Sequence, residues 1–480
     1  MSFASLNYLL FLAPVFFGYY LLGRRWRWVL LLAASVGFYA ALKAPYLLAV
    51  LLVVAGISFV AGRQLAGGST SAVRKTWFWG GVTANVLILA IVKYAPIVAG
   101  ALPVPGLGTL AAGGAHSPWV TIGVSYYVFQ AISYLADVHL GIIETEPHFG
   151  RFLLSLAFFP KLLQGPIERS GSILPQLRNP PEFDYEGVRR GLLLFGWGLF
   201  KKTVIADRLA LYVNPVYDNV HHYSGVVLVV ATYLYALQIF FDFSGYTDMA
   251  LGSARLFGIR LTPNFNNPYV ATSVADFWRR WHISFSSWIL DYIFKPLQML
   301  WRSARNWGTA LALLVTFFVS GLWHGASLCF VIWGLLHGVY LASSVFWRPW
   351  EKKLLKRFGL AKNWVADGMR MAVTFNLVCL AWVFFRAGTL AAAWYILSHA
   401  FSGTALVRTA LLSHGVGSVL LLAALLIPYF AMASRNEEAA MSRILALPAW
   451  ARWSFYYGLL VGVLALGVFD QGQKFVYFRF

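Results

Sequence analysis

Charged residues are scarce in this sequence. Asp, Glu, Lys and Arg make up 12% of its 480 residues, while hydrophobic residues make up 59%. A soluble globular domain carries about 25% charged residues. Apolar runs such as 6–22 and 405–429 approach or exceed the ~20 residues that one helical membrane crossing needs. The composition excludes an ordinary soluble protein and predicts a polytopic membrane protein.

Acidic residues are scarcer still. The chain has 18 acidic and 38 basic residues, which gives a net charge of +20. In a soluble protein this excess would suggest nucleic-acid binding. Here the basic residues stand in short tracts beside apolar runs, as they do in the cytoplasmic loops of membrane proteins. The charge is therefore interpreted as a determinant of topology, and no nucleic-acid partner is expected.

Cysteine and the common catalytic signatures are almost absent. Cys329 and Cys379 are the only cysteines and form no CxxC pair, and no HExxH motif or His pair at i,i+4 occurs, so we expect no metal and no bound cofactor. GxSxG, Walker and GxGxxG motifs are missing, which argues against a hydrolase or an ATPase. No internal repeat is found, which weakens a transporter interpretation.

Basic flanks predict how the chain crosses the membrane. Arg24, Arg25 and Arg27 follow the first apolar run, so the N-terminus should lie outside and these arginines in the cytoplasm. Residues 96–118 should form an external loop. The runs 191–200 and 284–294 lie between basic residues and are too short to span, because ten residues cover about 15 Å of helix. We therefore predict an all-α protein with about ten to twelve spans and re-entrant or in-plane helices.

Polar residues interrupt the apolar pattern between 275 and 327. Residues 307–347 have basic flanks and the length of two spans, so they should cross twice and turn at 325–327. This places His324 away from the cytoplasmic surface. Imidazole can accept and return a proton near neutral pH. A core histidine hydrogen-bonded to a carbonyl remains the alternative, and His337 is interpreted as structural.

A second polar cluster lies in DFWRRWHIS. A helix through it would place Trp278 and His282 on one face, and would pair Asp276 with Arg280 at i,i+4. Arg279 or Arg280 could instead contact an anionic, phosphate-bearing donor. Upstream, Asp242 and Asp248 are six residues apart, and Gly245 is expected to interrupt their helix. We interpret these carboxylates as polar packing rather than as an acid/base pair.

Six motifs occur in order along the chain: IGVSYYVFQAISYLADV, FFPKLLQGPIERS, FDFSGYTDMALGSARLFGI, NFNNPY, DFWRRWHISFSSW and GLWHGAS. Together they resemble the membrane-bound O-acyltransferase (MBOAT) family. Within that family the sequence is similar to the bacterial polysaccharide O-acetylases, and the teichoic-acid D-alanylation proteins are more distant. The resemblance covers 119–345 strongly and the flanks 1–118 and 346–480 more loosely, so 1–480 is expected to be one membrane domain with 119–345 as its catalytic core.

The resemblance implies acyl transfer in a membrane-embedded funnel or tunnel, with His324 essential and His282 a second functional residue. Arg279 and Arg280, with Trp281 and Trp323 next to the histidines, are the expected donor contacts. One departure is KPLQMLWRSARN, where relatives carry a glycine pair and an arginine-containing loop.

The resemblance also implies substrates and a location. Acetyl-CoA is the expected donor, and a polysaccharide (alginate-like, cellulose-like or peptidoglycan) is the expected acceptor. A periplasmic acyltransferase is the expected partner, membrane lipid surrounds the chain, and the bacterial inner membrane is the expected location. The alternatives are D-alanyl transfer to a teichoic-acid-like polymer, or a transporter or flippase of a lipid-linked sugar.

Overall fold

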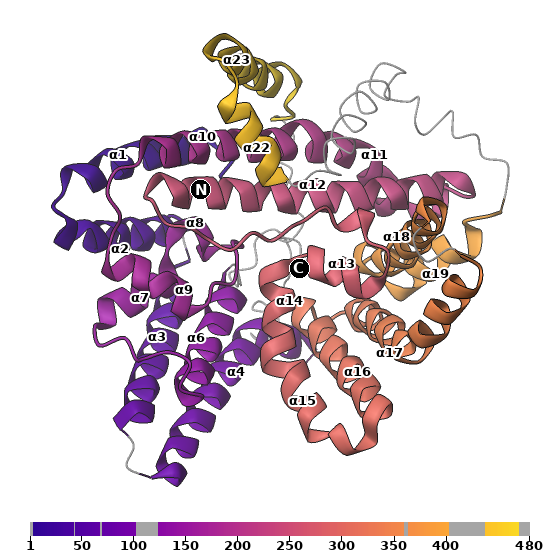
Figure 1. The fold of residues 1–480 in the computed structure, drawn as a ribbon, viewed down its shortest axis with the longest axis horizontal. Coiled ribbons are helices and arrows are strands. Elements are labelled where there is room, and N and C mark those ends of the chain that lie inside the picture. The colour runs from indigo at the N-terminus through magenta and orange to yellow at the C-terminus, as the bar shows by residue number, and fades with distance from the viewer. Residues whose placement is uncertain are drawn as a thin grey trace. The chain divides into compact units, whose positions relative to one another are not determined.

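A computed structural model describes residues 3–42, 44–67, 70–101, 123–359, 363–402 and 437–469. All regular secondary structure in these ranges is helical (Figure 1), which confirms the predicted all-α class. The chain divides into two compact units, one of 1–196 with 246–263 and one of 197–245 with 264–480. Helices α10 and α12 run from one unit into the other.

The first unit contains the N-terminal helices. They are α1 (Leu6–Leu21), α2 (Arg24–Ala40), α3 (Pro45–Gly67), α4 (Ser71–Ala101), α6 (Val124–His139), α7 (Phe149–Ala157), α8 (Phe159–Leu162), α9 (Ser170–Arg178) and most of α10 (Tyr185–Phe200). Helices α3, α4 and α6 pack on one another. Gly62 allows this, because a Cβ there would lie 2.6 Å from a ring carbon of Tyr134.

The second unit contains the remaining helices. They are the π-helical η1 (Lys201–Ala206), α11 (Asp207–Asp218), η2 (Val220–His222), most of α12 (Val226–Leu256), η3 (Pro268–Val270), α13 (Val274–Arg280), α14 (Ile283–Ile289), the π-helical η4 (Leu290–Phe294), α15 (Lys295–Leu300), η5 (Arg302–Ala304), α16 (Arg305–His324), α17 (Leu328–Arg357), α18 (Trp364–Arg386), α19 (Leu390–His399), α22 (Glu437–Ala446) and α23 (Ala449–Leu466).

Six helices of the described residues are long and apolar enough to cross a membrane, and the protein is a multi-pass membrane protein. They are Pro45–Gly67, Ser71–Tyr94, Val226–Leu256, Arg302–His324, Leu328–Arg357 and Trp364–Arg386. The total of ten to twelve stays a prediction, because the run 405–429 lies outside the described residues. Helix α4 continues to Ala101, six residues into the expected external loop, and 102–118 also lie outside.

The predicted turn at 325–327 is confirmed: residues 307–347 form a helical hairpin of two candidate membrane spans. Helices α16 and α17 lie side by side and turn at Gly325–Ser327 (Figure 1). Two glycines permit the contact: a Cβ at Gly334 would lie 2.3 Å from the carbonyl oxygen of Phe317, and one at Gly321 would lie 2.5 Å from that of Phe330. His324 ends α16, about 30 Å of helix from Arg305.

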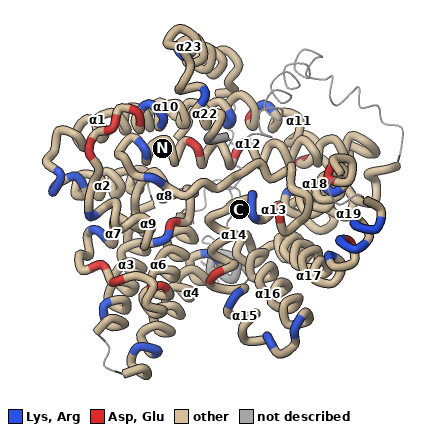
Figure 2. Tube along the Cα trace, in the orientation of Figure 1, with Lys and Arg blue, Asp and Glu red and all other residues tan. Residues whose placement is uncertain are grey.

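Basic residues of the hairpin lie at its open end. Arg302 precedes α16, Arg305 is its first residue, and a run of lysines and arginine ends α17. Figure 2 shows the middle of both helices without charged residues. This is the pattern expected when the apolar middle lies in hydrocarbon and the basic ends face the cytoplasm.

One local expectation is wrong. Helix α12 does not break at Gly245 but runs through it, and a Cβ at Gly245 would lie 2.7 Å from the carbonyl oxygen of Gly198, so this glycine permits close helix packing.

The short runs 191–200 and 284–294 are helical, as expected. They lie inside the longer helical stretches 185–218 and 283–300. Their re-entrant or in-plane orientation in the membrane stays a prediction.

Candidate active site

His324 is the buried last residue of α16 and is held by its own helix. Its Nδ1 lies 2.7 Å from the carbonyl oxygen of Ser320. A carbonyl oxygen can only accept a hydrogen bond, so Nδ1 carries the proton. The basic lone pair of the neutral ring is therefore on Nε2, the nitrogen on the other side of the imidazole.

Aromatic side chains surround the His324 ring. Trp323 and Trp333 each have ring centroids 4.5 Å from it, and Phe385 and Phe285 follow at 5.5 and 5.7 Å. His337, expected to be structural, accepts a hydrogen bond from Trp278 Nε1 over 3.2 Å. This packing excludes water and lowers the local dielectric, so interactions with developing charge are stronger here than in water.

His282 lies at a break between two helices. Helix α13 ends at Arg280, and His282 adopts a left-handed backbone conformation (φ 45°) before α14 begins at Ile283. The prediction that Trp278 and His282 share one helical face is therefore wrong. A non-glycine residue with positive φ is uncommon and often found at functional sites. The break turns the His282 ring towards Phe243, whose centroid is 4.8 Å away.

Asn264 fixes the tautomer of His282. The Asn264 Oδ1 accepts the backbone N–H of Ser284 at 3.1 Å and the Ser284 hydroxyl at 2.6 Å. His282 Nδ1 lies 3.3 Å from the same oxygen, so it donates and leaves the lone pair on Nε2. Burial, and secondly the neighbouring His324, hold the pKa of His282 well below its usual 6.5. His282 is therefore neutral at pH 7.

Phe285 connects the two histidines. Its ring centroid lies 5.2 Å from that of His282 and 5.7 Å from that of His324. Both histidines are buried, and both are held with the proton on Nδ1. The structure thus brings the two sequence-predicted histidines together, on either side of one phenylalanine ring. This arrangement suits proton removal from a hydroxyl group in a dry site.

The predicted donor contacts have different surroundings. Arg280 Nε pairs with Asp276 Oδ2 at 3.0 Å, which confirms the expected ion pair, while Arg279 is exposed. Trp281 is buried against Phe277. Trp323 stacks on Phe285 at 4.4 Å.

Arg279 lines an apolar cleft of about 290 Å³. Trp278 and Arg279 come from α13, Ser286 and Ser287 from α14, and Thr316 and Phe317 from α16. A cleft with an exposed cation on its wall can take a slender molecule that carries an anionic end. It lies on the helices that flank His282 and within the same unit.

Comparisons with known proteins agree with this geometry. Residues 142–371 match the membrane-bound O-acyltransferase family. The probable alginate O-acetylase AlgI of Pseudomonas aeruginosa is 34% identical over 410 residues, which is 84% of this chain and 75% of that protein. The chain belongs to the membrane-bound O-acyltransferase family. It is therefore an acyltransferase.

Other relatives of this membrane-bound O-acyltransferase are named for other acceptors and other transferred groups. A peptidoglycan O-acetyltransferase of Helicobacter pylori is 31% identical over 76% of this chain and 72% of its own length. A teichoic acid D-alanyltransferase of Bacillus subtilis is 26% identical over 64% of this chain and 77% of its own length. These identities establish the family, whereas the relatives' names differ in the polymer that accepts the acyl group.

The acyltransferase also contains a buried ionic cluster on η1, α11 and α12. Lys202 Nζ lies 2.7 Å from Asp207 and 2.6 Å from Asp242. Burial lowers the pKa of Lys202, but the two carboxylates outweigh this, so the pKa lies above its usual 10.5. The ammonium group of Lys202 is thus paired with two carboxylates. Asp242 is paired with Lys202, and its interpretation as polar packing stays a prediction.

A second buried cluster lies in the other unit. Lys161, from FFPKLLQGPIERS, donates to the side-chain oxygen of Gln130, and Glu168 accepts from the backbone N–H and the hydroxyl of Thr262. Burial lowers the pKa of Lys161 to about 7, against the raising effect of Glu168. The motif containing Lys161 and Glu168 signalled family membership, but its pattern did not predict these contacts.

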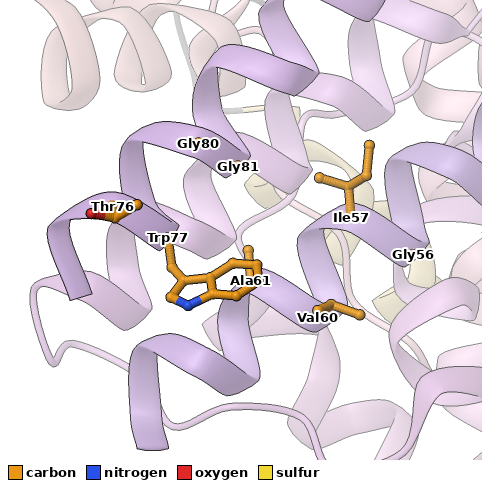
Figure 3. Close-up of a pocket in the computed structure, with 8 residues that line it drawn as sticks. All are labelled: Gly56, Ile57, Val60, Ala61, Thr76, Trp77, Gly80 and Gly81. Atoms are coloured by element: carbon orange, nitrogen blue, oxygen red, sulfur yellow. The ribbon is translucent and has the colours of Figure 1, made fainter. Parts of the chain in front are cut away.

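A larger groove of about 520 Å³ lies between α3 and α4 (Figure 3). Figure 3 shows Ile57, Val60 and Trp77 lining it together with small residues such as Gly80. No acid, base or thiol lines this groove, so it cannot supply the proton transfer that acyl transfer to a hydroxyl needs.

Sequence reasoning missed Asn264. Its motif, NFNNPY, was part of the family resemblance, but Asn264 stands eighteen residues before His282. No helical or strand periodicity relates residues across an irregular segment of that length.

Proposed function

We propose that this acyltransferase moves acetyl groups from cytoplasmic acetyl-CoA towards O-acetylation of an extracytoplasmic polysaccharide. The observation that carries the proposal is His324, buried in an aromatic cage with its Nδ1 proton held by the Ser320 carbonyl. A ring held in this way offers Nε2 as the base. The names of relatives that act on alginate and peptidoglycan support polymer acceptors.

The reaction follows from that geometry. His324 Nε2 takes the proton of an acceptor hydroxyl, and the oxygen attacks the carbonyl carbon of the acetyl thioester. The tetrahedral intermediate then collapses, the C–S bond breaks, and the thiolate takes the proton from the imidazolium. General-base catalysis of this kind contributes ~10²–10⁴-fold. His282, as a neutral neighbour, orients the reacting groups or assists proton transfer.

The donor contacts are part of the same proposal. Arg279 at the cleft and Arg280 beside it are assigned to the phosphates of acetyl-CoA, because guanidinium groups bind phosphate in a bidentate manner. Trp281 and Trp323 are assigned to shaping the path towards the histidines. The cleft next to Arg279 supports this assignment, because it is narrow and apolar enough for the arm that carries the thioester.

The acceptor side and the location complete the proposal. We place the protein in the bacterial inner membrane, with a periplasmic acyltransferase receiving the acetyl group and passing it to the polymer. Deleting the genes next to this one should abolish polymer acetylation while this protein stays in the membrane. Full acetylation by this chain alone would contradict the need for a partner. The neighbouring genes would also identify the polymer.

Labelled acetyl-CoA tests the proposed activity. Purified protein in nanodiscs is expected to transfer radiolabelled acetyl to an oligosaccharide acceptor or to the partner, and the His324→Gln variant is the control without the base. Flipping of a lipid-linked sugar without acyl movement would overturn the proposal in favour of a flippase. Transfer of D-alanine but not of acetyl would show that the transferred group is D-alanyl rather than acetyl.

A further inference from the structure

Three hydrogen bonds hold the side chain of Asn264, and only one of them comes from His282. Its Oδ1 accepts three hydrogen bonds, from the Ser284 backbone, the Ser284 hydroxyl and His282. The Ser284 backbone N–H can only donate, so the atom facing it must be the oxygen. This fixes which end of the amide is Oδ1 and which is Nδ2. The amide plane is therefore immobile, with its two N–H groups aimed away from Ser284.

Those two N–H groups have no acceptor among the residues that the structure describes, although Asn264 is only 1% exposed. About nine in ten buried polar groups in proteins are hydrogen-bonded. Leaving a buried donor unsatisfied costs ~1–3 kcal/mol. A rigid amide that holds His282 through its oxygen and has both N–H donors unsatisfied is consistent with a site whose acceptor arrives with the substrate.

Other buried donors with no acceptor in the described ranges lie around His324. They are the indole N–H groups of Trp333 and Trp382 and the hydroxyl of Ser320. The ring centroids of Trp333 and His324 are 4.5 Å apart, and Trp382 stacks on Trp333 with ring centroids 6.0 Å apart. A concentration of donors in an apolar cage indicates a ligand rich in oxygen acceptors.

Acyl transfer produces such an acceptor at one defined moment. When the acceptor oxygen bonds to the thioester carbon, the carbonyl π electrons move onto the carbonyl oxygen and make it an oxyanion. They return when the C–S bond breaks. Preorganised donors aimed at that oxygen commonly make the largest single contribution to catalysis, and losing one costs ~10²–10³-fold in rate.

We propose that the Asn264 side-chain amide donates to the acyl carbonyl oxygen and stabilises its oxyanion during transfer. The inference rests on the proposed acetyl transfer and adds a catalytic residue to it. Asn264 is favoured over the indoles because its amide is fixed by three hydrogen bonds, and an oxyanion donor must be in place before the charge develops.

The competing explanation is that Asn264 only supports His282. The Asn264→Asp variant separates the two, because a carboxylate keeps the acceptor for Ser284 and His282 but replaces the donors with negative charge. A supporting role predicts that Asp is tolerated better than Ala. An oxyanion role predicts that Asp is at least as damaging as Ala, with transfer slowed ~10²–10³-fold.

Asn266→Asp is the matched control. Asn266 lies two residues away and is exposed, and its recorded hydrogen bonds use only backbone atoms. The same charge change there should alter transfer by less than about twofold, as expected for a surface substitution.

The measurement is single-turnover acetyl transfer per folded molecule, with KM for acetyl-CoA determined separately. We expect Asn264→Asp to lower the rate while KM stays within about threefold, because the oxyanion contact is made in the transition state. If the wild type and Asn266→Asp transfer acetyl but Asn264→Asp keeps more than a fifth of the rate, the inference is overturned. If the wild type transfers no acetyl, the proposed function itself fails. If Asn264→Ala does not fold, the Asp variant still decides, since it keeps the three accepted hydrogen bonds.

Discussion

His324 donates its Nδ1 proton to the carbonyl oxygen of Ser320, one helical turn earlier, over 2.7 Å. A purely structural histidine would make the same contact. Two features distinguish this one: it ends α16 at the turn of the hairpin, and a second neutral histidine shares Phe285 with it. With the proton on Nδ1, its Nε2 carries the imidazole lone pair, within a cage of aromatic side chains.

Replacing His324 by glutamine should remove transfer without unfolding the protein. Glutamine adds no charge to the span and cannot act as a base at neutral pH, so the rate should fall ~10²–10⁴-fold. Acetyl transfer per folded molecule is the measurement, with size-exclusion chromatography reporting the folded amount. A packing role predicts the opposite pattern, in which less protein folds and the surviving fraction keeps near-normal specific activity.

His282 should contribute to the rate but not set its pH dependence above pH 6.5. Burial holds its pKa well below 6.5, so it binds no proton as the pH falls from 8 to 6.5. His282→Asn should lower the plateau of the pH–rate profile and leave any acid limb above pH 6.5 in place. Loss of such a limb in the variant would show that His282 titrates there after all.

The hairpin and its histidine could be predicted from the sequence, whereas the site around them could not. Residues 307–347 have two bilayer lengths of apolar sequence between basic flanks, and length with charge is enough to predict a double crossing. The Asp276–Arg280 pair was predictable for a similar reason, because residues four apart on a helix are neighbours.

Contacts made through irregular backbone had no such signal. The expected face shared by Trp278 and His282 assumed one continuous helix, but α13 ends at Arg280 and His282 takes a positive φ. That turn brings His282 to Asn264. Glycine disfavours a helix interior, but α12 continues through Gly245. Helix packing explains this, because only a residue without a Cβ leaves room for the backbone of Gly198.

The cluster around Lys202 should make stability depend on pH. Burial is the main cause that raises the pKa of Asp207 from 3.8 to about 7, against the opposing charge of Lys202. Between pH 4 and 7 the folded protein therefore binds a proton that the unfolded chain does not, so the stability from this group decreases as the pH rises through 7. Asp207→Asn should reduce this dependence in thermal unfolding between pH 5.5 and 8. An unchanged dependence would contradict the assignment.

The first turn of α10 should face the cytoplasm. Tyr185 is 65% exposed, and the native Cys329 and Cys379 are buried, so a Tyr185→Cys variant offers one accessible thiol among the cysteines. A membrane-impermeant maleimide should label it only after intact cells are permeabilised. Ready labelling from outside would reverse the orientation inferred from the basic flanks.

Arg279 should contribute to donor binding and not to the chemical step. It lines the cleft beside α13, and a charge-assisted hydrogen bond contributes ~1.5–3 kcal/mol, so Arg279→Gln should raise KM for acetyl-CoA by about tenfold or more and leave kcat nearly unchanged. Arg302→Gln is the matched control, because Arg302 is also exposed but lies outside the cleft. Equal KM values for acetyl-CoA in both variants would show that Arg279 does not bind the donor.

Arg280 needs a separate test, because its ion pair with Asp276 is one sufficient reason for its presence. If it also binds the donor, Arg280→Gln raises KM while Asp276→Asn does not, since only the arginine can contact phosphate. If the pair is structural alone, both single variants lower thermal stability, the double variant is little worse than either, and KM stays constant in all three. We expect the first pattern, with a smaller rise in KM than for Arg279→Gln, because Asp276 already neutralises part of the Arg280 charge.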